Sequence, residues 1–105
     1  MEDALVEKLV RELVSAEPGV RERAADETTD VHRGLRGEDV NALVRVLVAA
    51  LLAETVASCQ EAQLNALCDL KAWHNLDLEQ LRPLWGLRGT VQPPHAGYLD
   101  ELLKE

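Results

Sequence analysis

Apolar side chains recur along most of this chain at the three- and four-residue spacing that places them on one face of an α-helix. The first such stripe predicts an amphipathic helix that ends near Ala16, because the stretch 17–19 contains a proline and a glycine. No segment of useful length alternates with the period of two that a β-strand requires, so we predict an all-α fold. Further helices are expected over 18 to about 33, 39–54 and 59 to about 72, with a turn at 55–58.

The last third of the chain has a less regular pattern. Asp77 begins a capping-box pattern that predicts the start of a helix, and Pro83 within that helix predicts a kink or a later start. We expect Trp85 to lie on the inner, apolar face of this helix. The stretch 86–97 holds two adjacent prolines and is expected to be the longest irregular segment, followed by a short amphipathic helix over 98–104.

The sequence also contains a weak internal repeat at a shift of 39 positions. Residues 20–26 then lie over 59–65, and apolar positions meet apolar positions on both sides of this match. A repeat of about 40 residues built from two helices is the signature of an α-solenoid. We therefore expect one helical domain over 1–105, with repeat units at about 1–35 and 39–72 and a degenerate third unit at 77–105.

Two stretches carry a resemblance to a known family. Glu17-Pro18-Gly19-Val20-Arg21-Glu22-Arg23-Ala24-Ala25 looks like the turn and second-helix start of a HEAT repeat, and Glu61-Ala62-Gln63-Leu64-Asn65-Ala66-Leu67 resembles the corresponding stretch of another. The resemblance covers about residues 1–72, and it implies two to three stacked antiparallel helix pairs, although the second repeat lacks the turn proline. HEAT-like proteins are mostly binding scaffolds, and very short acidic ones resemble bacterial immunity proteins that neutralise a basic toxin domain.

Charge narrows the class of partner. The chain has 19 acidic and 11 basic residues, a net charge of −8, which repels phosphate backbones and disfavours DNA or RNA binding. The strongest candidate for a binding surface is an acidic ridge. It consists of two rows of mainly acidic residues at helical spacing, and the repeat shift of 39 positions places one row over the other. We interpret the ridge as a docking face for a basic protein, the alternative being an ordinary solvated face. Its members are Glu22, Asp26 and Asp30 on the second predicted helix and Glu61, Asn65 and Asp69 on the fourth.

Three further residues stand at the end of the fourth predicted helix, beside the ridge. Trp73, His74 and Asp77 are candidate partner-binding residues, because tryptophan at an exposed helix end is a common interface anchor. The alternative is that Trp73 plugs the core beneath a long loop.

Residues suited to catalysis or to metal binding are scattered. Neither the three histidines nor the two cysteines show the paired spacing of a zinc site, and no glycine-rich phosphate loop or nucleophile elbow is present. We expect no enzyme activity, no metal and no cofactor. Cys59 and Cys68 are nine positions apart in one predicted helix, too far to bridge, so free thiols in a reducing compartment are expected.

The predicted location is the cytoplasm. The opening Met1-Glu2-Asp3-Ala4 lacks the basic and apolar regions of a signal peptide. The most apolar stretch, 40–53, contains Asn41 and Arg45 and is shorter than the about 20 residues that a membrane span needs.

These features together predict a protein-binding module, and the specific hypothesis is an immunity protein that masks a basic toxin domain such as a nuclease. The runner-up is a structural or regulatory HEAT-like scaffold subunit that self-associates through the apolar surface of 39–54. A third class is a small all-α enzyme or metal carrier that uses His32, His74 and aspartates. The identity of the partner and the oligomeric state stay open.

Overall fold

The computed structural model describes residues 2–104, and the side chains of residues 4–104. Of the acidic opening, Met1 lies outside the described residues, as does Glu105 at the other end. The described chain contains helices and no strand, which confirms the predicted all-α class. None of these helices combines the length and the hydropathy that a membrane crossing requires. The elements are α1 (Glu2–Leu13), α2 (Pro18–Val31), the 3₁₀-helix η1 (His32–Gly34), α3 (Gly37–Ala53), α4 (Ala57–Trp73), the 3₁₀-helix η2 (Leu78–Leu87) and α5 (Pro93–Leu103).

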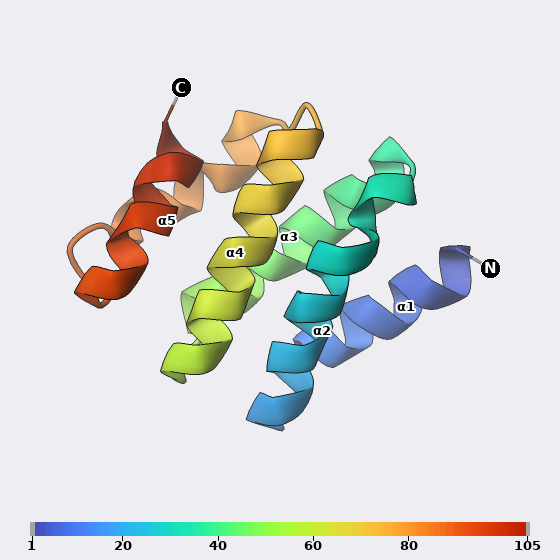
Figure 1. The fold of residues 1–105 in the computed structure, drawn as a ribbon, viewed down its shortest axis with the longest axis horizontal. Helices are drawn as coiled ribbons and strands as arrows, with labels where there is room; N and C mark the ends of the chain where they lie inside the picture. The colour runs from blue at the N-terminus through green and yellow to red at the C-terminus, as the bar shows by residue number, and fades with distance from the viewer. Residues whose placement is uncertain (1, 105) are drawn as a thin grey trace.

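The helices form two layers. Figure 1 shows α2, α4 and α5 next to one another in front of α1 and α3. Within the layers α2 packs against α4 and α4 against α5, while α1 contacts α3 and α3 contacts η2. Between the layers α1 packs on α2, α3 on α4 and η2 on α5. Each of these helices therefore packs on one of its neighbours along the chain and on helices two positions away, and HEAT-like stacking stays a prediction.

Leucine dominates the interior between the layers. A core without phenylalanine must be filled by aliphatic side chains, and leucine is also a strong helix former. The amphipathic stripes identified in the sequence supply these residues from α1, α3, α4, η2 and α5, whereas α2 contains no leucine and buries Ala24, Ala25 and Thr28. The largest fully buried side chains are Leu9, Leu13, Leu43, Leu47, Leu51, Leu64, Leu67, Leu70, Leu81, Leu84, Leu99 and Leu102.

The turn between α3 and α4 is built by a side chain. Helix α3 ends at Ala53, and the Glu54 carboxylate accepts hydrogen bonds from the backbone N–H groups of Thr55 (3.1 Å) and Val56 (3.0 Å). The chain therefore reverses between Ala53 and Ala57 without glycine or proline. This turn starts one residue earlier and ends two residues earlier than the turn predicted at 55–58.

The C-terminal third is more regular than the sequence suggested. The prediction that 86–97 is irregular is wrong, because α5 begins at Pro93, and prolines fit the first turn of a helix, where no N–H partner is needed. The irregular stretch is confined to residues 88–92, where Gly89 adopts a positive φ of 85°. Pro83 lies within a ten-residue 3₁₀-helix. Trp85, expected in the core, is 47% exposed.

A lysine holds the end of α5 against α4. The Lys71 ammonium donates to the carbonyl oxygens of Glu101 (2.9 Å), Leu102 (3.0 Å) and Lys104 (2.5 Å). The last carbonyls of a helix lack partners within the helix and carry its negative dipole end, so a cation there is favourable. Lys71 therefore acts as a C-terminal cap for α5 supplied by another helix.

Candidate functional site

Helices α2 and α4, which carry the two predicted acidic rows, lie side by side and run in the same direction (Figure 1). Near their N-terminal ends the Cys59 thiol donates to the Pro18 carbonyl oxygen at 3.1 Å. Beyond the C-terminal end of α2, His32 bonds to Asp69 of α4. Contacts at both ends fix the register of the two helices, and both rows belong to the same layer.

The α2 row of the ridge faces solvent. Asp26 and Asp30 are exposed and Glu22 is half-buried, and none of the three carboxylates has an ion-pair or hydrogen-bond partner among the described residues. Partial burial raises the pKa of Asp26, and the nearby charges of Glu22 and Asp30 raise it further. The negative charge of this row is therefore not neutralised within the described chain.

The α4 row is divided between two environments. Glu61 and Asn65 are exposed, and Glu61 Oε2 lies 4.0 Å from His95 Nε2 of α5. Asp69 is only 29% exposed in its side chain, and its Oδ2 lies 2.6 Å from His32 Nε2 and 4.0 Å from Arg33 Nη2. Asp69 is therefore engaged by the end of α2, whereas Glu61 and Asn65 remain on the outer face.

Asp69, His32 and His74 form a continuous hydrogen-bonded chain. His32 is fully buried, and its Nδ1 lies 3.0 Å from His74 Nε2. Asp69 accepts from His32 Nε2–H, whereas in the bond between the two rings either nitrogen can be the donor, according to the tautomer. The structure thus joins the two histidines named for the enzyme or metal alternative. No three His, Cys, Asp or Glu side chains in the described part are grouped to hold a metal ion.

Trp73 projects from the end of α4 with 57% of its surface exposed, so it does not plug the core. The Arg33 guanidinium lies over its ring, with Cζ 4.1 Å from the ring centroid. Asp77 has a structural task, because its side chain accepts from the backbone N–H of Glu79 at 3.0 Å and caps η2. Trp73, His74 and Asp69 are therefore brought together beside α2, while Asp77 is occupied within its own segment.

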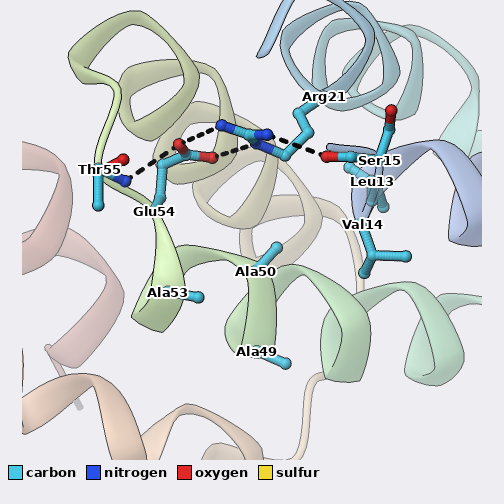
Figure 2. Close-up of a pocket in the computed structure, with 9 residues that line it drawn as sticks. All are labelled: Leu13, Val14, Ser15, Arg21, Ala49, Ala50, Ala53, Glu54 and Thr55. Atoms are coloured by element: carbon cyan, nitrogen blue, oxygen red, sulfur yellow. Dashed lines mark hydrogen bonds and ion pairs between the residues drawn. The ribbon is translucent and has the colours of Figure 1, made fainter. Parts of the chain in front are cut away.

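Arg21, next to Glu22 in the sequence, does not pair with the acidic row. Figure 2 shows its guanidinium directed at Glu54, with Nε to Oε1 and Nη2 to Oε2 both at 2.9 Å. Its Nη1 donates to the Ser15 carbonyl oxygen at 2.9 Å. Gln63 donates to Glu54 Oε1 at 2.7 Å. Arg21 thus satisfies a buried carboxylate and contributes little to screening Asp26 and Asp30.

The Arg21–Glu54 pair closes one end of a groove between α1 and α3. The groove has a volume of about 390 Å³ and an apolar floor that includes Ala49, Ala50 and Ala53 (Figure 2). Val14, at the end of α1, lines the same groove and is 62% exposed. The polar groups at its closed end already bond to one another, so the open part of the groove is chiefly apolar.

Both cysteines are free thiols, as the sequence predicted. Burial raises the pKa of Cys68 to about 11, with the charge of Glu101 adding to the effect. Burial also raises the pKa of Cys59. Both thiols are therefore protonated at neutral pH.

Sequence reasoning missed two of the long-range polar pairs that shape the site, Arg21 with Glu54 and His32 with Asp69. Nothing local marks them, since each joins residues more than thirty positions apart. One usable signal existed: Glu54 ends an apolar helix where no glycine or proline marks the turn, so a polar side chain was needed to satisfy the free N–H groups.

The comparisons with known proteins add no family. No family model matches the chain, and searches of curated proteins and of solved structures gave no significant match. The HEAT-like resemblance therefore stays a prediction based on two short stretches.

Proposed function

We propose that this chain is a protein-binding module that docks a basic protein on the outer face of α2 and α4. The observation that carries the proposal is the pair Asp26 and Asp30, which are exposed, adjacent and without a cationic partner among the described residues. Like charges four residues apart on a helix are unfavourable by a few tenths of a kcal/mol. A basic partner would convert this repulsion into attraction.

Glu61 and Asn65 extend the proposed face onto α4, since both are exposed on the neighbouring helix of the same layer. The net charge of −8 adds a long-range field that would speed the encounter with a positively charged protein. The finer form of the proposal is an immunity protein. In that case the acidic face covers the surface with which a basic toxin domain, such as a nuclease, meets phosphate.

The test compares three forms of the protein as affinity baits in extracts that contain candidate partners. The first is wild type, the second carries Asp26→Lys with Asp30→Lys, and the third carries Glu7→Lys with Glu79→Lys. Glu7 and Glu79 are exposed carboxylates in the other layer, so the third form undergoes the same change in net charge. We expect a basic protein to be retained by the wild type and by the third form, and lost by the second.

The partner so identified is then studied with purified proteins. At low salt the second form should associate several-fold to about tenfold more slowly than wild type, because electrostatic steering acts on the association rate. Equal association by all three forms, or equal loss in both variants, would show that this face does not dock the partner. Inhibition of a catalytic activity of the partner by the wild-type protein would support the immunity form, and unchanged activity would contradict it.

A further inference from the structure

The end of α4 presents an aromatic ring and a carboxylate to one guanidinium. Arg33 Cζ lies 4.1 Å from the Trp73 ring centroid, and Arg33 Nη2 lies 4.0 Å from Asp69 Oδ2. Trp73 and Asp69 are four positions apart on the same helix, so they share one face. The chain's own arginine thus shows which chemistry this surface accepts: a planar cation that stacks on a ring and faces a carboxylate.

One of the two receptor groups, Asp69, is held more firmly than the arginine that occupies the site. Asp69 is fixed by the fully buried His32 at 2.6 Å. Arg33, in contrast, belongs to the three-residue helix η1, and its side chain is 55% exposed. An exposed cation–π contact corresponds to about a two- to fivefold change in an equilibrium constant, so another guanidinium can displace it.

We propose that Trp73 and Asp69 form a binding site for an arginine side chain of the partner, and that Arg33 occupies this site in the free protein. This inference rests on the proposed function and makes it more specific: the basic partner presents arginine here. Lysine is a poorer occupant, because its compact ammonium group is not planar and cannot stack on the ring as a guanidinium does. The exposed carboxylates of Asp26 and Asp30 on the neighbouring helix would then hold other basic residues of the partner.

The second tryptophan provides an internal control. Arg88 Cζ lies 5.0 Å from the Trp85 ring centroid, and Arg88 Nη2 lies 3.8 Å from Asp100 Oδ1. This pair is looser, and Trp85 belongs to η2, in the layer opposite α2 and α4. The two indole N–H resonances therefore report on both tryptophans in one experiment.

The experiment titrates the ¹⁵N-labelled full chain at low salt with tetra-arginine amide and, separately, with tetra-lysine amide of the same charge. We expect the arginine peptide to bind about two- to fivefold more tightly and to shift the Trp73 resonance rather than that of Trp85. Trp73→Leu should abolish the preference for arginine while leaving lysine-peptide binding unchanged. An unchanged Trp85 resonance in this variant verifies the fold.

Displacement of Arg33 is tested with a matched pair of variants. Arg33→Ala and Arg23→Ala each remove one exposed positive charge near the acidic face, but only the first vacates the Trp73 ring. Arg33→Ala should raise affinity for the arginine peptide about two- to fivefold more than Arg23→Ala does. Equal gains in the two variants would overturn the displacement.

The remaining outcomes separate this inference from the proposed function. If both peptides bind equally, and Asp26→Lys with Asp30→Lys weakens both, the arginine site is wrong and the acidic face stands. If only Trp85 shifts, the site assignment is wrong. If neither peptide binds, both proposals fail.

Discussion

Arg21 and Glu54 form a two-pronged ion pair across 33 positions of sequence, with both hydrogen bonds at 2.9 Å. The Glu54 side chain is 1% exposed, and the same carboxylate accepts a hydrogen bond from the N–H of Val56, directly before α4. One side chain therefore joins the beginning of α2, the end of α3 and the beginning of α4. It also explains how a buried charge is tolerated: each oxygen accepts more than one hydrogen bond.

Removal of this charge should destabilise the fold. Glu54→Gln keeps the shape of the side chain but leaves the Arg21 guanidinium, 16% exposed, without its counter-charge. Breaking a buried pair in this way costs about 3–5 kcal/mol, so we expect a loss of that size in the free energy of unfolding measured with urea. The control is Glu7→Gln, at an exposed carboxylate, which should change stability by less than about 0.5 kcal/mol. Equal effects of the two substitutions would contradict the role assigned to the pair.

The same residue makes stability depend on acid pH. Burial opposes ionisation of Glu54, but hydrogen bonds from Arg21, the Val56 N–H and Gln63 outweigh it and lower its pKa from the ordinary 4.5 to about 2. The unfolded chain therefore takes up this proton first as the pH falls, so the contribution of Glu54 is complete above about pH 4.5 and is lost towards pH 2. This contribution of Glu54 to the free energy of unfolding amounts to about 3 kcal/mol. Urea unfolding between pH 4.5 and 2 should show that wild type loses more unfolding free energy than Glu54→Gln does, by this amount. Parallel curves of unfolding free energy against pH would disprove the role of Glu54.

Asp26 should have the opposite effect. Partial burial and the charges of Glu22 and Asp30 raise its pKa, so its ionised form is less favourable in the folded chain than in the unfolded one. Asp26→Asn should therefore stabilise the fold at neutral pH by a few tenths of a kcal/mol, and this gain should vanish as the pH falls through the pKa. Thermal unfolding at two pH values measures it, with Glu7→Gln as control. The same substitution should weaken binding of a basic partner, the pattern expected of a residue kept for docking.

Lys71 should stabilise α5 locally. Lys71→Met keeps much of the aliphatic length but removes the donor that holds the carbonyls of Glu101, Leu102 and Lys104. We expect the local stability of α5 to fall by about 1–2 kcal/mol. Hydrogen exchange should then show faster exchange of amides in α5 and little change in α1 and α2. Lys8→Met, which breaks a half-exposed pair with Glu27 at 2.9 Å, should cost less stability than Lys71→Met does. Uniform acceleration over the whole chain after Lys71→Met would argue against a local cap.

The main outline of the fold was predictable because helix periodicity is a local property of sequence. The stripes located α1 to α4 with small errors at their ends, and Pro18 marked the start of α2. The start of α5 was misplaced because Pro93 and Pro94 were assigned to a loop, although proline is equally suited to a first helical turn. The position of Trp85 was wrong because periodicity cannot tell which apolar residues of a short 3₁₀-helix find cover.

The candidate site was predictable only in part. Helical spacing placed Asp26 and Asp30 on one face, and both are exposed. Spacing could not show that Asp69 is drawn towards His32, since that contact depends on how α2 and α4 pack. For the same reason spacing could not show that Arg21, next to Glu22 in the sequence, pairs with Glu54.

The fastening of α2 to α4 at both ends has a thermodynamic consequence. Cys59 holds Pro18 at one end and Asp69 holds His32 at the other, so neither helix can slide along its neighbour without breaking a bond to a buried group. The spacing of the outward-facing carboxylates is thus already set before any encounter. Association then requires little ordering of the backbone. Selectivity would depend on whether the positive charges of a binding partner match the fixed positions of these carboxylates.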